Sequence, residues 1–186
     1  MKEFKLPKIY KWQQWRELIS TFKYEIGQYV PSEGGVIYHR FLTGTTQNYL
    51  VVDTQDLGQE VWSNIYNVSS GASSLWDGQS NTNTITTQTG AVTGAAFLCA
   101  ASTNNGKNDW YLPAVQELNK LWNNTLEVSQ GIETAGGSQL DIPSYHWSSS
   151  ELNSNEAWLF LFIGGSTSYD NKGNLFYVRA VRKFSI

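Results

Sequence analysis

The hydrophobic positions of this chain fall into short runs separated by Gly, Ser, Asn and Asp, residues that favour tight turns. Near the C-terminus, such runs predict three strands, at residues 145–151, 156–162 and 177–182. Earlier runs predict three more, at residues 24–30, 35–38 and 49–53. Rigid strands joined by irregular polar loops are a common support for recognition surfaces. The C-terminal strands are therefore the first place to look for function.

An amphipathic helix is predicted at residues 8–22, because apolar residues recur there at spacings of three and four and share one face. This face is formed by Trp12, Trp15, Leu18, Ile19 and Phe22. Two interpretations stay open. The face packs on the chain's own domain, or it docks onto another subunit, for which exposed tryptophans are typical anchors.

Two further helices are predicted downstream. Residues 90–101 are mostly small, so a helix there can approach a neighbour closely. A second helix starts at Leu112–Pro113, where proline gives up an N–H that would have no partner. Its apolar side carries Val115, Leu118, Leu121 and Trp122. The Ser-, Thr-, Asn- and Gly-rich stretch at 69–89 is predicted to be an ordered loop held by Trp76, and 135–138 a flexible spacer.

These elements predict an α+β fold. Residues 1–23 are assigned to an N-terminal helical attachment segment and residues 24–186 to a ligand-binding domain. Aromatic residues make up 14% of the 186-residue chain and charged residues only 16%, which suits a folded domain rather than a disordered one. The net charge of −3 argues against a nucleic-acid partner.

The single cysteine, Cys99, excludes an intrachain disulfide and a multi-cysteine zinc site, and its apolar neighbours predict a small buried side chain. The N-terminal residues lack the apolar core of a secretory signal, and no run is long enough to span a bilayer. We therefore expect no membrane insertion and no export by the usual route.

Two sequence motifs resemble those of a known family. Residues 106–118 are similar to the "G-x-x-D-W-R-L-P-T-x-x-E-L" helix start of a large family of bacterial and phage domains with a C-type lectin fold. Its C-terminal signature is matched by Trp147-Ser148-Ser149-Ser150-Glu151, Ala157-Trp158 and residues 177–181. The resemblance covers residues 24–184 and implies a C-type lectin fold. Tyr111 replaces the usual Arg and Ala114 the usual Thr, which we interpret as tolerated surface and capping changes.

Within this family, the chain looks most like the variable proteins of diversity-generating retroelements, which include phage receptor-binding proteins. In such proteins an Asn-rich template repeat is copied with its adenines randomised. At the corresponding slots, every residue of this chain is reachable from an Asn codon by changing adenines only. The resemblance implies that these slots bind ligand; they are Leu152, Leu159, Leu161, Ser166, Ser168, Tyr169, Asp170, Gly173, Leu175 and Phe176.

Strand alternation gives the same interpretation for residues 158–162. Trp158, Phe160 and Phe162 share one face, and Leu159 and Leu161 share the other. If the aromatic residues form the core, the two leucines are exposed beside polar loops, as in a contact surface. The alternative is a strand that is buried on both faces.

The sequence offers little catalytic or metal chemistry. Asn108-Asp109-Trp110 lacks the accompanying proline loop of calcium lectins, and Asp109 is expected to serve the turn before the second helix. The carboxylates Glu151, Glu156 and Asp170 are too scattered for a calcium cage. His39 and His146 have no spaced partner and are expected to be structural. We therefore expect no metal, no cofactor and no enzymatic activity.

The sequence thus predicts a non-enzymatic recognition module, namely a phage tail-fibre or head-fibre protein that binds a host receptor. Its expected partners are a host surface protein or glycan, other virion subunits and copies of itself, as in a trimer. Its expected location is the virion, assembled in the host cytoplasm, or alternatively a cell surface. Two other functions stay open: a structural or decorating virion subunit without a ligand, and a calcium-dependent lectin.

Overall fold

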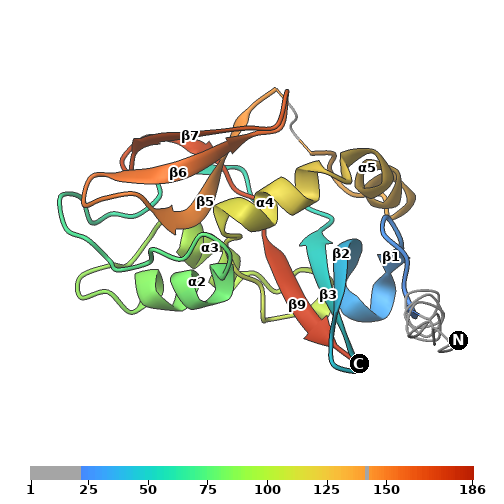
Figure 1. Ribbon diagram of the computed structural model, residues 1–186. Helices are drawn as coiled ribbons and strands as arrows, with labels where there is room; N and C mark the ends of the chain where they lie inside the picture. Colours follow the sequence, from blue (N-terminus) through green and yellow to red (C-terminus); the bar gives the residue numbers. More distant parts are fainter. Residues whose placement is uncertain (1–21, 141–142) are drawn as a thin grey trace, which may run out of the picture.

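Two β-sheets and the helices packed around them form the part of the chain that the computed structural model describes, residues 22–140 and 143–186 (Figure 1). The first sheet has the order β1-β2-β3-β9 and is antiparallel throughout. Its strands are β1 (Tyr29–Val30), β2 (Gly35–Thr43), β3 (Thr46–Asp53) and β9 (Val181–Ser185). A tight turn at Gly44 (φ 62°) joins β2 to β3, and these two strands are longer than predicted. Of the strand predicted at 24–30, only Tyr29–Val30 forms.

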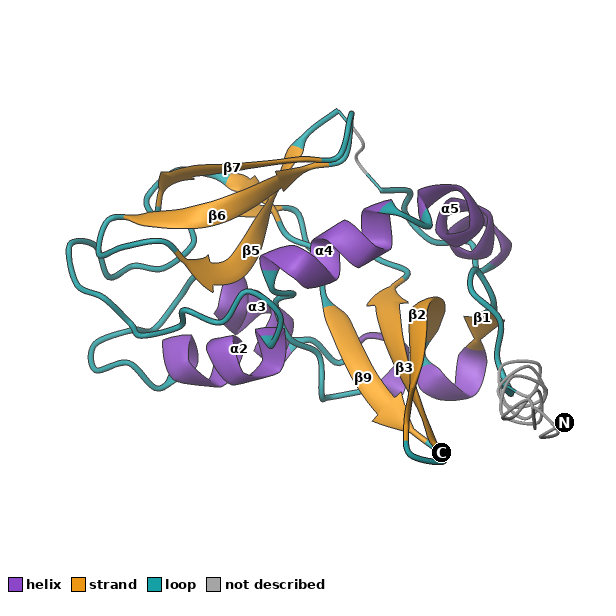
Figure 2. Ribbon diagram, viewed as in Figure 1, coloured by secondary structure: helices purple, strands orange, loops and turns teal. Residues whose placement is uncertain are grey.

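The second sheet contains two of the three C-terminal strands that the sequence predicted; the third, at 177–182, is divided between Phe176–Tyr177 of this sheet and β9 of the first sheet. Its order is β4-β8-β5-β6-β7, and only the β5–β8 pair is parallel. The strands are β4 (Gln59–Glu60), β5 (Tyr145–Glu151), β6 (Glu156–Leu161), β7 (Ser166–Asn171) and β8 (Phe176–Tyr177). Strand β7 lies at one edge of this sheet, so the β6–β7 hairpin is its outermost part (Figure 2).

The helices are α2 (Gly78–Thr86), α3 (Ala95–Ala101), α4 (Val115–Trp122) and α5 (Thr125–Thr134), with short 3-10 turns at Pro31–Glu33 and Asn104–Gly106. Helix α4 lies between the two sheets (Figure 1). It buries Val115, Leu118 and Leu121, as predicted. Helix α3 begins after Gly94, where a Cβ would meet the Trp62 carbonyl at 2.4 Å, so only glycine permits this close approach.

The described residues thus form a mixed α+β fold, as the sequence predicted, but the ordered loop predicted at 69–89 is partly wrong. Helix α2 forms there because the Asp77 carboxylate accepts a hydrogen bond from the Ser80 N–H and caps its first turn. Its buried side is largely polar, which hid the helical period from a search for apolar residues.

Two apolar clusters form the core. One surrounds Trp62 and Trp147 and includes Cys99, which is fully buried as predicted. The other surrounds α4 and includes Phe160 of β6. Because β6 contributes to both clusters, the second sheet is covered on both sides along part of its length.

The predicted N-terminal helix lies almost wholly outside the described residues, and this includes Trp12, Trp15, Leu18 and Ile19. Phe22 is described, and its ring packs edge-on against Tyr49 of β3 at a centroid distance of 5.8 Å. The Lys23 N–H also donates to the Tyr49 hydroxyl. The chain therefore joins the domain firmly from residue 22 onward.

Candidate functional site

Strand register places half of the predicted binding residues on one face of the second sheet. Leu159 lies opposite Ser168, and Leu161 lies opposite Ser166. Directly opposed residues of antiparallel strands point to the same side of a sheet. Asp170, two residues after Ser168, belongs to that side too.

Phe176 lies on the same face of the sheet, in β8, which pairs with β5 on the side away from β6. Its ring lies edge-on to Trp147 at 5.0 Å and to Tyr145 at 6.0 Å, and both of these residues oppose leucines of β6. Tyr169 points to the opposite face, where its ring meets Trp158 at 6.0 Å. The predicted set therefore flanks the β6–β7 hairpin on both sides.

The expectation for Leu159 is wrong. This side chain is only 2% exposed and packs with Trp147 and Ala157 in the first core cluster. Phe160 is buried on the opposite face, whereas Trp158 and Leu161 are half-buried. Apolar residues on both faces of β6 are buried because core clusters lie on both sides of the sheet. Simple alternation between an aromatic core face and an exposed leucine face does not apply.

The remaining predicted residues reach the solvent to different degrees. Leu152, Tyr169 and Leu175 are the most exposed large ones, at 37%, 52% and 58%. Ser166 is exposed, and the others are half-buried. We call this set the display surface; its members are Leu152, Leu161, Ser166, Ser168, Tyr169, Asp170, Gly173, Leu175 and Phe176.

A loop that sequence reasoning did not include adjoins the display surface. Tyr66 and Val68 are 43% and 55% exposed. The Tyr66 ring lies so close to Gly173 that an added Cβ would meet it at 3.0 Å. The Val68 carbonyl accepts a hydrogen bond from Lys172. An exposed Tyr and Val inside a polar run were the available signal, but their distance along the chain from residue 173 hid the contact.

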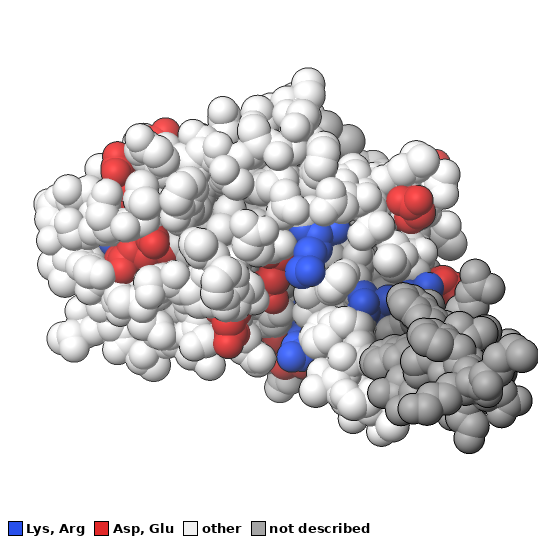
Figure 3. Space-filling model, in the orientation of Figure 1, with Lys and Arg blue, Asp and Glu red and all other residues white. Residues whose placement is uncertain are grey.

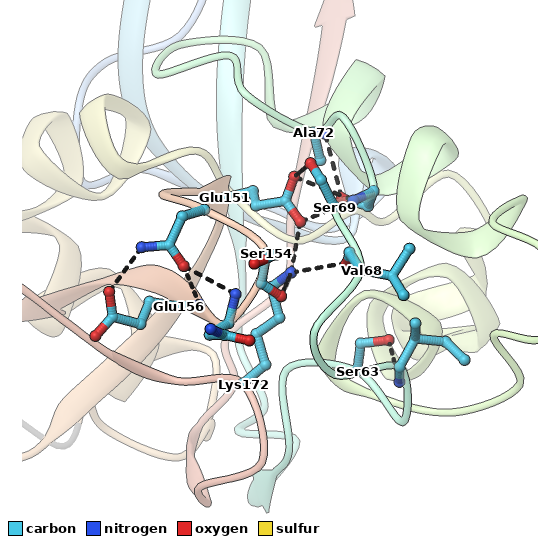
Figure 4. Close-up of polar contacts among 12 residues, drawn as sticks. Ser63, Val68, Ser69, Ala72, Glu151, Ser154, Glu156 and Lys172 are labelled. Carbon is cyan, nitrogen blue, oxygen red and sulfur yellow. Dashed lines mark hydrogen bonds and ion pairs between the residues drawn. The ribbon is translucent and has the colours of Figure 1, made fainter.

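Beneath the display surface lies a buried ion pair (Figure 4). The Lys172 Nζ is 2.5 Å from the Glu151 Oε1, and the two side chains are 0% and 3% exposed. Lys172 also donates to the carbonyls of Ser154 at 2.8 Å and Val68 at 3.3 Å. One ammonium group therefore joins the end of β5, the β5–β6 turn and the loop at residue 68.

The Glu151 carboxylate has three further donors. It accepts hydrogen bonds from the Ser69 hydroxyl at 2.6 Å and from the backbone N–H groups of Ser70 and Gly71 at 2.8 and 3.0 Å. Burial alone would raise the pKa of Glu151, but these bonds and the Lys172 ammonium outweigh it and lower the pKa below its ordinary value. Glu151, Lys172 and residues 69–71 are called the polar frame below.

The other letters of the Trp147–Glu151 motif also make buried structural bonds. The Trp147 indole donates to the Glu60 carbonyl at 2.9 Å, and the Ser148 hydroxyl donates to the Trp158 carbonyl at 2.8 Å. The Ser150 hydroxyl donates to the Ser74 carbonyl at 2.7 Å. The motif therefore fastens β5 to its neighbours, and none of its side chains is exposed.

The turn between β6 and β7 is fixed as well. The Trp122 indole of α4 donates to the Phe162 carbonyl at 2.8 Å. Gly165 has φ 66°, and a Cβ there would meet the Trp122 ring at 2.4 Å. Glycine is therefore required for both conformation and space. The hairpin that carries much of the display surface rests on an inflexible base.

The two arginines of residues 177–182 are structural. Arg182 forms a two-pronged contact with Asp109, at 2.7 and 2.8 Å, and also reaches Glu33. Asp109 thus ties residues 107–111 to β9 and does more than serve a turn. Arg179 is 1% exposed and donates to the carbonyls of Asp53, Ser138 and Gln139.

Tyr111 is not a surface change, contrary to our expectation. It is 3% exposed, and its hydroxyl donates to the Glu117 Oε1 at 2.9 Å. The other oxygen of Glu117 accepts from the N–H groups of Ala114 and Gly78. Ala114 has no side-chain acceptor, so Glu117 accepts the Ala114 N–H, while the N–H groups of Val115 and Gln116 donate to the Ser150 hydroxyl and the Leu75 carbonyl. Burial raises the pKa of Glu117 from 4.5 to about 7, against the lowering effect of these bonds.

Both histidines pack against aromatic rings. His146 is fully buried, with its ring against Phe162 and Tyr177, as expected of a structural histidine. His39 is half-buried and stacked on Phe41, and burial, with Lys120 nearby, lowers its pKa from 6.5 to about 4. In residues 22–140 and 143–186, no group of three or more His, Cys, Asp or Glu side chains could hold a metal ion. In the same residues, no helix is both long and apolar enough to cross a membrane.

Comparison with known proteins places the chain in a family. The model of the Lcl C-terminal domain family matches residues 61–182, well over half of the sequence. The chain belongs to this family. The match includes the polar frame, the display surface and both sequence motifs. No curated protein matches.

A solved structure shares the fold. It is a fimbrial protein from Bacteroides ovatus ATCC 8483, similar with a TM-score of 0.58 and 15% sequence identity. The alignment covers 72% of this chain and 35% of that chain, so this chain spans about a third of its neighbour's length. At this identity, the likeness shows the fold alone.

Proposed function

We propose that the chain is a non-enzymatic recognition module that attaches its bearer to a surface through the display surface. The observation that carries this proposal is that, in the second sheet, the buried motif residues and the exposed predicted residues have different roles. The side chains of the Trp147–Glu151 motif are buried and make hydrogen bonds that hold β5 to neighbouring strands and loops. The most exposed predicted residues make few bonds and can change without disturbing those contacts.

The composition of the display surface supports binding to a ligand. Tyr169, Leu175 and Leu152 offer apolar contact area, and Ser166 and Asp170 offer polar contacts. Rigid aromatic residues beside adaptable polar ones are also typical of antibody loops. The flanking Tyr66 and Val68 enlarge the apolar part. Because the display surface is divided between the two faces of the β6–β7 hairpin, each copy should bind with modest affinity, which several copies on one particle would increase.

The finer proposal is a C-type lectin fold used on a phage fibre as a receptor-binding protein, with a surface varied by a diversity-generating retroelement. Its support is the resemblance of residues 147–181 to such proteins. In addition, every residue at the predicted variable positions can arise from an Asn codon by changes of adenines alone. A reverse transcriptase gene and an adenine-rich copy of this repeat in the flanking DNA would support it. Identical residues 159–176 in sibling isolates would contradict it.

A second candidate is an adhesin or structural subunit on a cell surface. It is favoured by the similarity in fold to a protein described as fimbrial. Both candidates use the same domain and differ in the particle that carries it.

A cell-binding assay tests the shared claim. Fluorescent beads carrying many copies of the chain are mixed with a panel of intact bacterial strains, and bound beads are counted by flow cytometry. The triple variant Leu152→Ser, Tyr169→Ser and Leu175→Ser should lose binding. The control variant, Val92→Ser with Leu126→Ser, removes residues that are 74% and 69% exposed outside the display surface and should bind normally. Equal binding by both variants would refute the assignment.

A further inference from the structure

A cleft of about 600 Å³ lies apart from the display surface, between the first sheet, α4 and the start of α2. Figure 3 shows basic and acidic atoms close together near the centre of the view, over α4 and the first sheet. Ligand sites commonly have this size and combine apolar walls with a few converging polar groups. The lining consists of His39, Phe41, Leu50, Trp76, Asp77, Gln79, Tyr111, Glu117, Lys120 and Lys183.

One wall of the cleft is aromatic and open to solvent. Trp76 is 71% exposed, although large apolar side chains are usually covered. His39 and Phe41 are stacked at a centroid distance of 5.8 Å on the sheet wall. Because His39 has its pKa lowered to about 4, it is uncharged near neutral pH. This wall can pack against an apolar side chain.

The cleft also gathers unpaired positive charge. The described residues contain eight lysines and arginines, and five of them lie within ion-pair distance of a carboxylate. Of the three that do not, Lys120 and Lys183 both line the cleft, and Lys23 lies outside it. The Lys183 ammonium rests 5.4 Å from the centre of the Phe41 ring. Two ammonium groups that have no carboxylate partner in the described part of the chain favour an anionic ligand.

The acidic groups of the cleft do not offset these charges fully. Glu117 is already held by Tyr111 and by two backbone N–H groups, and its raised pKa leaves it partly protonated near neutral pH. Asp77 caps α2. The neutral polar groups of the lining that make no hydrogen bond with the described residues are the Gln79 amide, the His39 imidazole and the Trp76 indole N–H. A carboxylate beside an apolar side chain matches the two ammonium groups and the aromatic wall.

The edge of the first sheet provides a further feature that suits a peptide. The N–H and C=O groups of Val181 bond to Tyr111 on the side of β9 away from β3. In an antiparallel strand, alternate residues direct these groups to the same side, so those of Lys183 and Ser185 point outward too. No described residue bonds to them there. An extended peptide could use them to add a strand to this edge.

We propose that this cleft is a second binding site, which takes an acidic peptide segment of a partner protein. A carboxylate of the peptide reaches Lys120 and Lys183, and a neighbouring apolar side chain packs on Trp76 and Phe41. The site is independent of the display surface, so one domain can hold a surface ligand and a partner protein at once.

Fluorescence polarisation with the full chain tests the proposal. The probe is a fluorescein-labelled peptide of three Glu-Leu repeats, and its partner probe has Gln in place of Glu. The Glu-Leu peptide should bind and the Gln-Leu peptide should not. The double variant Lys120→Gln and Lys183→Gln should weaken binding about tenfold or more, since each exposed ion pair is worth up to about fivefold. Trp76→Ala should weaken it as well.

The matched control is Lys23→Gln, which removes the unpaired lysine outside the cleft and should leave binding unchanged. The triple display-surface variant should also bind the peptide normally, which separates this site from the proposed function. Thermal unfolding shows whether each variant remains folded. Unchanged binding by the double lysine variant would overturn the proposal. So would equal binding of the Gln-Leu peptide, or displacement by free glucuronate at concentrations where free glutamate has no effect.

Discussion

Replacing Lys172 with methionine tests whether the polar frame holds the display surface in place. The substitution keeps an unbranched apolar side chain of four heavy atoms and removes the ammonium group that lies 2.5 Å from the Glu151 carboxylate. Breaking a buried ion pair by removing one partner costs about 3–5 kcal/mol, because the other charge stays buried. Glu151 would keep its hydrogen bonds from Ser69, Ser70 and Gly71, so we expect the free energy of unfolding to fall by about 3 kcal/mol.

The reverse substitution should cost more. In Glu151→Gln, the Lys172 ammonium keeps the carbonyls of Val68 and Ser154 and the Trp62 ring, 4.9 Å away, but has no counter-charge. We expect about 4–5 kcal/mol. The double variant should cost about 2 kcal/mol less than the sum of the two single variants, because the groups contact each other.

Urea unfolding followed by tryptophan fluorescence measures these free energies. Lys107→Met is the matched control, since Lys107 is 3.8 Å from Glu33 and partly exposed, and its loss should cost under about 1 kcal/mol. The pKa of Glu151 is lowered in the folded state, so its stabilisation is present above the ordinary value of 4.5 and lost as the pH falls through the folded-state pKa. A Lys172→Met cost below about 1 kcal/mol, with additive effects in the double variant, would refute this reasoning.

Three more predictions follow from single side chains. Tyr169→Ser should change the free energy of unfolding by less than about 0.5 kcal/mol in the urea assay, because the ring is 52% exposed, yet it should weaken bead binding. The pKa of Glu117 is raised to about 7, so the folded state holds its proton more tightly and the contribution of Glu117 to stability should fall as the pH rises from about 4.5 to about 7. His39, whose pKa is lowered to about 4, changes stability in the opposite direction, so the quantity to measure is the melting temperature of the wild type minus that of Glu117→Gln. This difference should fall over the same pH range; a constant difference would contradict the prediction. The buried hydroxyl of Tyr38 has no hydrogen-bond partner among the described residues, so Tyr38→Phe should raise stability, by up to about 1 kcal/mol, in calorimetry.

The sequence predicted β5, β6 and the apolar side of α4 because these elements have clear patterns of apolar residues. It did not predict β4, which has two residues, or β7, which is largely polar. It misplaced Leu159 because alternation gives the side on which a residue lies and does not tell whether that side is covered. It missed α2, whose buried residues include Asn81 and Thr82, since polar residues satisfied inside the fold look like loop residues in a sequence.

The candidate site shows the same limit. Ten slots could be chosen from their codons and from a resemblance, but Tyr66 enters only through its contact with residue 173. Tyr111 was misjudged because it lies outside any helix, whereas its partner Glu117 is in the first turn of α4. No periodic pattern in a sequence indicates such a phenol–carboxyl pair. Contacts between segments far apart in the chain leave no local pattern in the sequence, so they could not be predicted from it.

The Glu151 carboxylate holds the loop at residues 69–71 mainly through backbone groups, so the loop tolerates sequence change at residue 70. Two of its donors in that loop belong to the peptide backbone, which every amino acid except proline supplies. Ser70 could therefore be replaced by almost any other residue without loss of the hydrogen bonds from the loop backbone to Glu151. A second stretch of the chain, beside the hairpin, is thus open to mutation and selection, and a designer of binding libraries could randomise both together.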